Sequence, residues 1–258
     1  MNALYQKIWN FPESCWLDKR LTKAFFLKNF ALSSTEKKLL NNQIQQMQWL
    51  ASIKPNTANI PAIKNQQYIY EEIQLMCVTI PNNELPNLGK RCIELLQKYI
   101  PYQMLVIVED AHGFMVNACD KRINLNDNTK RTIESYLTSV EIPKLYQKLT
   151  TTEFFTALDF AALDKTNMET TYQSYLKAIV QYQAAEVTGI FQKERPTRTE
   201  EDMANLLQIE QIEKEITSLA SQLKKAKQIN EKVQLNIEIQ KKRNQIIQLK
   251  NSLMKWFF

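Results

Sequence analysis

The sequence predicts an α+β fold: a small, mostly antiparallel sheet within residues 46–142, flanked by helices and followed by a C-terminal helical hairpin, a coiled coil. Two observations predict this class. Apolar, β-branched runs that are typical of strands are concentrated in the middle of the chain. Residues 198–258 contain neither Gly nor Pro and carry an apolar seam at heptad spacing. We therefore divide the chain into an N-terminal α+β part of residues 1–192, a polar linker of residues 193–198 and a coiled-coil hairpin of residues 199–258.

Composition is consistent with one domain and an appendage. The 258 residues are 44% hydrophobic and 23% charged, which is ordinary for a soluble globular protein. No run approaches the roughly 20 apolar residues of a membrane span. The first 20 residues lack the apolar core and cleavage site of a signal peptide, so we expect folded sequence there. The net charge of +6 permits contact with nucleic acid without requiring it.

The four cysteines are widely spaced and form no Cys-x-x-Cys pair, which argues against a metal or redox motif. We expect free, core-packed thiols and a reducing cytoplasm. They are Cys15, Cys77, Cys92 and Cys119.

The N-terminal part is expected to be helical. Residues 17–29 mix Leu, Phe and Lys at a spacing compatible with a helix. Ser33 and Glu36 have the spacing of a capping box, which predicts a helix that runs to about Ile44.

Strands follow in the middle of the chain. Four segments have strand character: residues 48–53, 68–80, 104–109 and 114–120. The turn Asp110–Gly113 joins the last two as a hairpin. Residues 84–99 are predicted to form an amphipathic helix, and residues 132–142 are assigned to a strand in preference to a short helix. After Pro143 the chain turns helical again, with a helix over residues 168–187 that Gly189 ends.

The C-terminal segment carries two apolar seams. Thr199 is the expected N-cap, with three acidic residues in the first turn. The first seam runs through Ile209, Ile212, Ile216, Leu219, Leu223 and Ala226. The second runs through Leu235, Ile239, Ile246, Leu249, Leu253 and Trp256. The phase slips over residues 224–230, which favours two antiparallel helices; one long helix that dimerises through a stutter remains the alternative.

A heptad seam needs a covering helix, so these residues predict a protein-interaction element. The expected partner-binding residues are Ile212, Ile216, Leu219, Leu223, Ile246, Leu253 and Trp256, the last as an aromatic anchor. Basic residues beside the seams could touch DNA or could simply be a solvated flank; they are Lys224, Lys225, Lys227, Lys241, Lys242 and Arg243.

Few residues suggest chemistry. Three glycines cannot supply a phosphate-binding loop, and neither nucleotide fingerprint is present, so we expect no cofactor. The single histidine, His112, excludes a His-rich zinc site and is expected to be a solvated turn residue. We expect no metal centre.

A metal-dependent nuclease is the enzymatic alternative. Nucleases of the restriction-endonuclease type hold Mg²⁺ between two strand carboxylates beside a lysine. The residues available for this are Glu72, Glu109, Asp120 and Lys121. Because Asp120 and Lys121 are adjacent on a strand, their side chains should point to opposite faces, which fits such a site poorly. Charges at the sheet edge and at the hairpin ends are the simpler interpretation.

Three segments resemble one family. Residues 49–60 are similar to its Trp…Lys-Pro-x-Thr-x-Asn-Ile segment, and the pair 106–109 and 120–123 is similar to its hydrophobic strands ending in Lys-Arg. Residues 225–236 resemble its Lys-x-Lys-Gln-Phe-Asn…Val-Glu-Leu-Asn signature, with Ile229 in the aromatic position and Gln234 in the acidic one. The chain therefore resembles the domain-of-unknown-function 4391 family, which is prokaryotic.

The resemblance implies a role by association, because such proteins tend to be encoded beside helicases and DNA methyltransferases in restriction-type or anti-phage gene clusters. Together with the cysteine usage, the hydropathy and the heptad seams, this leads us to expect a cytoplasmic, non-catalytic interaction subunit. It would dock a helicase or a DNA methyltransferase through the coiled coil, with DNA contact as an accessory feature and no contact with a membrane. A nuclease effector of the same kind of system and a homodimer joined by its tails are the alternatives.

Overall fold

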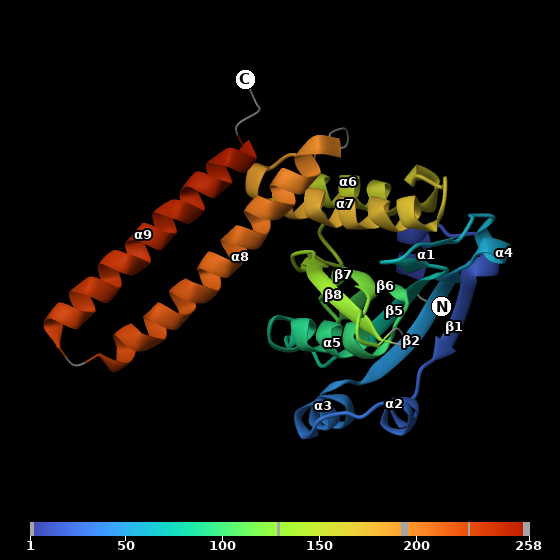
Figure 1. The fold of residues 1–258 in the computed structure, drawn as a ribbon, viewed down its shortest axis with the longest axis horizontal. Coiled ribbons are helices and arrows are strands. Elements are labelled where there is room, and N and C mark those ends of the chain that lie inside the picture. Colours follow the sequence, from blue (N-terminus) through green and yellow to red (C-terminus); the bar gives the residue numbers. More distant parts are fainter. Residues whose placement is uncertain (1–2, 128–129, 192–195, 227, 255–258) are drawn as a thin grey trace. The chain divides into compact units, whose positions relative to one another are not determined.

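The computed structural model describes residues 3–127, 130–191, 196–226 and 228–254. The chain forms two compact units, which we call the body (residues 1–179) and the hairpin unit (residues 180–258). Helices account for 54% of the residues and strands for 22% (Figure 1). The predicted fold class, a mostly antiparallel sheet with helices and a C-terminal helical pair, is confirmed.

The body is built on a seven-stranded sheet of order β1-β2-β5-β6-β7-β8, with β9 beside β7. The strands are β1 (Trp16–Arg20), β2 (Gln46–Ile53), β5 (Ile73–Thr79), β6 (Gln103–Glu109), β7 (Gly113–Ile123), β8 (Arg131–Thr138) and β9 (Ile142–Pro143). Among the described strands of this sheet, only β5 and β6 pair in parallel, and α5 (Leu85–Tyr99) makes the crossover between them. Strands β3 (Ile63–Lys64) and β4 (Ile69–Tyr70) form a separate two-stranded sheet.

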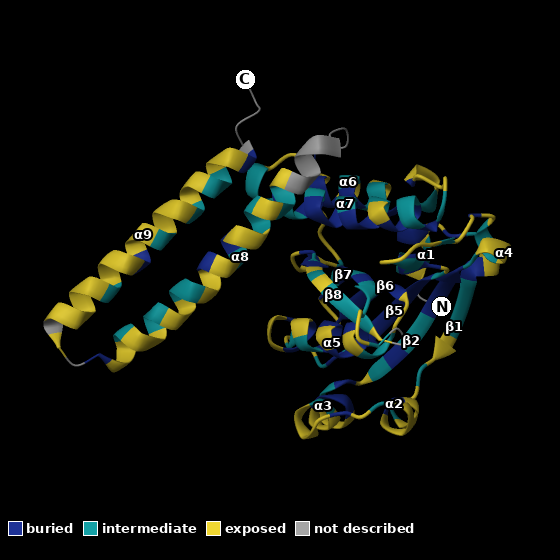
Figure 2. Ribbon diagram, viewed as in Figure 1, coloured by how far each residue is buried: buried dark blue, intermediate teal, exposed yellow. Residues whose placement is uncertain are grey.

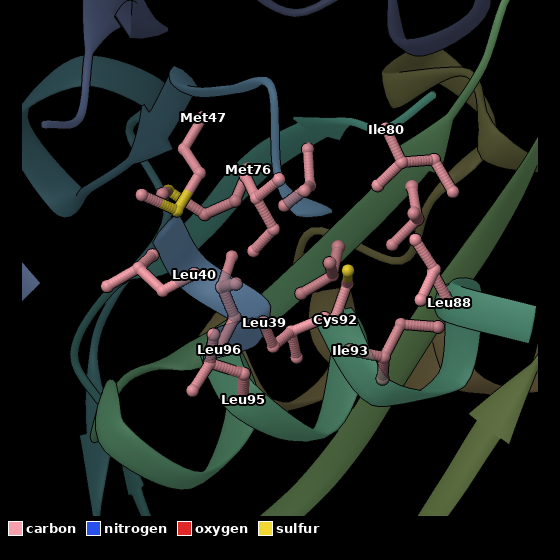
Figure 3. Close-up of a cluster of buried hydrophobic side chains, with 14 of the residues drawn as sticks. Leu39, Leu40, Met47, Met76, Ile80, Leu88, Cys92, Ile93, Leu95 and Leu96 are labelled. Carbon is pink, nitrogen blue, oxygen red and sulfur yellow. The ribbon is translucent and has the colours of Figure 1, made fainter. Parts of the chain in front are cut away.

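Helices cover both faces of this sheet. On one face, α5 buries Leu88, Cys92 and Leu96 against strand residues such as Met76 (Figure 3). The π-helical turn η2 (Leu39–Gln43), which follows α3 (Ser34–Lys38), contributes Leu39 and Leu40 to the same cluster. Because both faces are covered, β6 is buried along its whole length (Figure 2), which explains its continuous apolar run.

The other face carries α1 (Ala3–Trp9), α6 (Leu149–Leu158) and the first part of α7 (Met168–Thr188). The ring of Tyr5 meets Phe114 of β7 edge-on at 5.5 Å, and Trp9 packs on Tyr175 of α7 at 5.2 Å between ring centroids. These aromatic contacts hold the N-terminal helix to β7 and α7, as expected for folded sequence there.

Several local predictions are confirmed. Ser33 and Glu36 form the reciprocal capping box, with Glu36 N donating to Ser33 Oγ at 3.2 Å and Ser33 N donating to Glu36 Oε2 at 2.7 Å. Helix α7 ends before Gly189, whose φ of +79° favours glycine. The strand predicted over residues 132–142 is β8, whose bounds are Arg131–Thr138.

Two predictions of secondary structure are wrong. The expected helix over residues 17–29 is instead the strand β1 followed by α2 (Lys23–Asn29). Strand β1 forms because its backbone pairs with β2, a tertiary contact that the spacing of apolar residues does not reveal. The single strand expected over residues 68–80 is interrupted at Glu71–Glu72, so that β4 and β5 belong to different sheets.

The hairpin unit contains α8 (Pro196–Lys225) and α9 (Ile229–Met254), which pack together. Helix α8 begins three residues before Thr199, so the predicted N-cap is wrong; a proline is well tolerated in a first helical turn. Residues 193–195 of the predicted linker lie outside the described residues. In the part of the chain that the structure describes, no helix is both long enough and apolar enough to cross a membrane.

Candidate functional site

An ion pair between α8 and α9 shows the register of the hairpin. Lys242 Nζ of α9 lies 2.5 Å from Glu215 Oε2 of α8, and Gln211 Nε2 donates to the other oxygen of this carboxylate at 3.0 Å. These donors lower the pKa of Glu215. Because only residues 226–228 separate the helices, they run antiparallel (Figure 1). The ion pair shows that Glu215 lies level with Lys242.

The predicted partner-binding residues lie on the two seams of this hairpin. Ile212 and Leu253 are buried, whereas Ile216, Leu219, Leu223 and Ile246 are half-buried. Both seams are more buried than the residues beside them, as expected when α8 and α9 cover each other. Trp256, the predicted anchor, lies outside the described residues.

The predicted nucleic-acid residues are mostly exposed. Lys224 and Lys225 end α8, and Lys241 and Arg243 lie on α9. Lys242 differs from its neighbours because it is half-buried in the ion pair with Glu215. Lys227 lies outside the described residues. The exposed members are available for contact with an anionic partner.

In the body, Glu109 is the centre of a buried polar cluster at the end of β6. Tyr5 Oη donates to Glu109 Oε2 at 2.6 Å, Lys144 Nζ lies 2.7 Å from the same oxygen, and Thr79 Oγ1 donates to Oε1 at 3.3 Å. Burial and the neighbouring Cys77 and Glu109 raise the pKa of Tyr5 far above its usual value, so its hydroxyl remains a donor. The cluster joins α1, β5, β6 and the segment after β9.

The turn after β6 is closed by Asp110. Its carboxylate accepts hydrogen bonds from the backbone N–H groups of Asn83, His112 and Gly113 at 2.9, 2.8 and 3.0 Å. Burial alone would raise the pKa of Asp110, but these three donors outweigh it and lower the pKa. His112 is an exposed turn residue, as predicted.

Asp120 and Lys121 point to opposite faces of β7, as their adjacency predicts. Asp120 accepts from Tyr70 Oη at 3.0 Å and from Gln173 Nε2 of α7 at 3.4 Å. Burial raises the pKa of Asp120, against the effect of these hydrogen bonds. Lys121 Nζ instead donates to Ile100 O at 2.7 Å and Tyr102 O at 3.0 Å, just beyond the C-terminus of α5.

Lys121 is fully buried with no carboxylate among its hydrogen-bond partners in the described chain. Burial lowers the pKa of its ammonium group to about 7. Ile100 is the C-cap of α5, and a position beside the C-terminus of a helix is favourable for a cation, so Lys121 acts as a cap of that helix. The structure therefore gives Lys121 a structural role.

Glu109 is not brought together with the other acids of the nuclease alternative. Glu72 is held by Lys54 Nζ at 3.1 Å, one residue before the start of β5. Glu109 is level with Thr79 at the far end of β5, roughly 20 Å away at 3.3 Å per residue. Asp120 lies level with the start of β6, at a similar distance from Glu109. No group of three potential metal ligands is present among the described residues.

The cluster around Glu109 contains two residues that sequence reasoning missed. Tyr5 and Lys144 reach Glu109 from positions 104 residues before it and 35 residues after it. Neither lies in a motif, so only the tertiary fold reveals them. The one indication of this cluster in the sequence is the pair of acidic residues, Glu109 and Asp110, at the end of the strand predicted over residues 104–109.

A family model described as Domain of unknown function (DUF4391) matches residues 9–246. Neither the search of the curated proteins nor the search of the solved structures found a match.

Proposed function

The chain belongs to the family described as Domain of unknown function (DUF4391), and on this premise we propose that it is a non-catalytic interaction subunit. It acts in the cytoplasm, in a bacterial restriction or anti-phage complex, and docks a helicase or a DNA methyltransferase through the hairpin of α8 and α9. The family match itself names no activity, so the docking role depends on the shape and chemistry of the hairpin unit, and the class of partner depends on the gene association that the resemblance implies.

The observation that carries the proposal is the hairpin. Its helices contain 30 and 26 residues, more than twice the mean helix length of about 11–12 residues. They cover each other along one seam and leave most of their surface exposed (Figure 2). A long, two-helix surface of this kind is well suited to docking a partner helix or groove.

The body supports a non-catalytic role. The carboxylates considered for catalysis accept hydrogen bonds from internal donors: Tyr5 and Thr79 for Glu109, and Tyr70 for Asp120. These contacts join elements of the sheet and helices, so the carboxylates contribute to architecture. DNA contact would come from the exposed cations of α8 and α9, such as Lys225 and Arg243.

The test is a tagged pull-down of the full-length protein from its native cell, read by mass spectrometry. The variant I216D/L219D places two charges on the α8 seam and should open the hairpin. The matched control, S218D/S221D, places the same charges at exposed positions of α8. We expect a helicase or methyltransferase to be recovered with the parent and the control but not with the seam variant.

Two results would contradict the proposal. One is recovery of the same partner with the seam variant after circular dichroism has shown that its helix content has fallen. The other is a parent protein that brings down neither enzyme. Sedimentation of the parent shows separately whether the tails pair in a homodimer.

A further inference from the structure

Helix α9 carries a second apolar stripe that the hairpin does not use. Val233, Ile237 and Ile247 are 49%, 45% and 55% exposed. With Gln240 and Asn244 between them, they follow one another at steps of four and three residues. This is the spacing of a coiled-coil seam.

The stripe lies on the back of α9. At 3.6 residues per turn, it is centred about 160° around the helix from the seam that includes Ile239 and Leu253. Burial agrees with this geometry, because Ile239 and Leu253 are buried while the stripe is exposed. The stripe therefore cannot contribute to the contact with α8.

The corresponding face of α8 differs. Opposite its own seam, α8 exposes Leu207, Gln211, Lys214, Ser218 and Ser221, again at steps of three and four residues. Leu207 is the one apolar side chain of these five, so this face of α8 is mainly a solvated helix back. The second apolar stripe is specific to α9 and does not follow from hairpin formation.

The charged residues that flank the stripe are all basic. In the heptad frame of the stripe, the flanking positions are Gln234, Lys241, Gln248, Asn236, Arg243 and Lys250. Three of the six are basic and none is acidic. Flanking residues select partners in coiled coils by pairing opposite charges, so this border disfavours a second copy of α9 and favours an acidic helix.

We propose that the back of α9, from Val233 to Ile247, docks an amphipathic helix of a partner protein whose apolar seam is flanked by Glu or Asp. The segment spans roughly 21 Å, or four helical turns, at 1.5 Å per residue. Gln240 and Asn244 set the register, because polar seam positions favour one alignment over its neighbours. The inference rests on the proposed function and assigns it a surface and a partner chemistry.

The probe is a synthetic four-heptad peptide with Leu on its seam and Glu on its flanks, and a second peptide has Lys in place of Glu. Binding of each to the full-length protein is measured by fluorescence anisotropy. We expect the Glu peptide to bind, with weaker binding at high salt, and the Lys peptide not to bind. V233N/I237N/I247N should weaken binding about 100-fold, because three half-exposed aliphatic side chains lose their burial.

The matched control is S218N/S221N at exposed positions of α8, which should bind the Glu peptide as the parent does. K241Q/R243Q should weaken binding by a smaller factor and reduce its salt dependence. Circular dichroism confirms that each variant keeps its helices. The proposal is overturned by equal binding of both peptides, by binding that V233N/I237N/I247N leaves unchanged, or by a parent dimer that this variant dissociates.

The two proposals can fail separately. If the Glu peptide binds the stripe but the pull-down recovers neither enzyme, the proposed function fails and the docking surface stands. If V233N/I237N/I247N retains the native partner that the seam variant loses, the hairpin docks its partner by another face and the inference fails.

Discussion

The body and the hairpin unit carry their charged residues in opposite ways. In the body, Glu109 and Lys121 are buried and Asp120 is half-buried, and each has hydrogen-bond partners from other elements. In the hairpin unit, Lys241 and Arg243 are exposed beside an exposed apolar stripe. A charged side chain that is removed from solvent and hydrogen-bonded within the chain therefore serves to hold the fold together. An exposed charged side chain beside exposed apolar surface instead marks a surface that can bind a partner.

The largest effect should come from the buried cluster. Glu109→Ala leaves Lys144 Nζ with only the main-chain oxygen of Asp110 among its described partners and deprives Tyr5 Oη of its acceptor. We expect the free energy of unfolding to fall by about 3 kcal/mol, because one partner of a largely buried pair is removed. Urea unfolding followed by tryptophan fluorescence measures this.

The control for that variant is Glu71→Ala, since Glu71 is exposed and should change stability by less than about 0.5 kcal/mol. Equal effects of the two substitutions would show that Glu109 stabilises the fold no more than a surface acid does. The structural role assigned to the buried charges of the body would then be wrong.

A second test uses the pH dependence of stability. The pKa of Lys121 is about 7 in the folded protein and about 10.4 in the unfolded chain. Between these values the unfolded state binds the extra proton, so the contribution of Lys121 makes stability rise with pH, by on the order of 2–3 kcal/mol between pH 7 and pH 9. Below about pH 6 both states are protonated and this contribution is constant.

Lys121→Met isolates that contribution, because the other titrating groups remain. The difference in unfolding free energy between the parent and the variant should change with pH over this window. A difference that is the same at pH 7 and pH 9 would mean that Lys121 stays charged in the folded protein.

An intermediate effect is expected in the hairpin unit. Ile212→Ala removes a buried seam side chain and should cost about 2 kcal/mol. We expect amide hydrogen exchange to accelerate in α8 and α9 while β5 and β6 keep their protection, because the two units are compact separately. Ser218→Ala is the exposed control. Faster exchange throughout the sheet would show that the units unfold as one.

For Asp120→Ala we expect no change in DNA cleavage, which makes it the smallest of the expected effects. Asp120 and Glu109 lie roughly 20 Å apart along the sheet, so we expect Asp120→Ala to leave the behaviour of the protein toward DNA unchanged. Plasmid DNA incubated with Mg²⁺ or Mn²⁺ and either protein is read by electrophoresis. Cleavage by the parent that the variant lacks would restore the nuclease hypothesis.

Features that depend on neighbouring residues could be predicted from the sequence, whereas features that depend on tertiary contacts could not. The capping box of Ser33 and Glu36 and the stop at Gly189 act within a few residues, so their patterns predicted the structure. Strand β1 was missed because it depends on pairing with β2, about 30 residues away. The partners of Glu109 were missed for the same reason, since Tyr5 reaches it from 104 residues away.

All four cysteines are free and buried. Burial raises the pKa of Cys92 and of Cys119 to about 12, raises that of Cys77 well above its usual value, and raises that of Cys15 as well. A thiol reagent added to the native protein therefore reacts with them only as the body opens, and its rate reports that opening. A cysteine introduced at Ile237 would be the one accessible thiol among the described residues. The rate at which the same reagent modifies it would show whether a partner covers the back of α9.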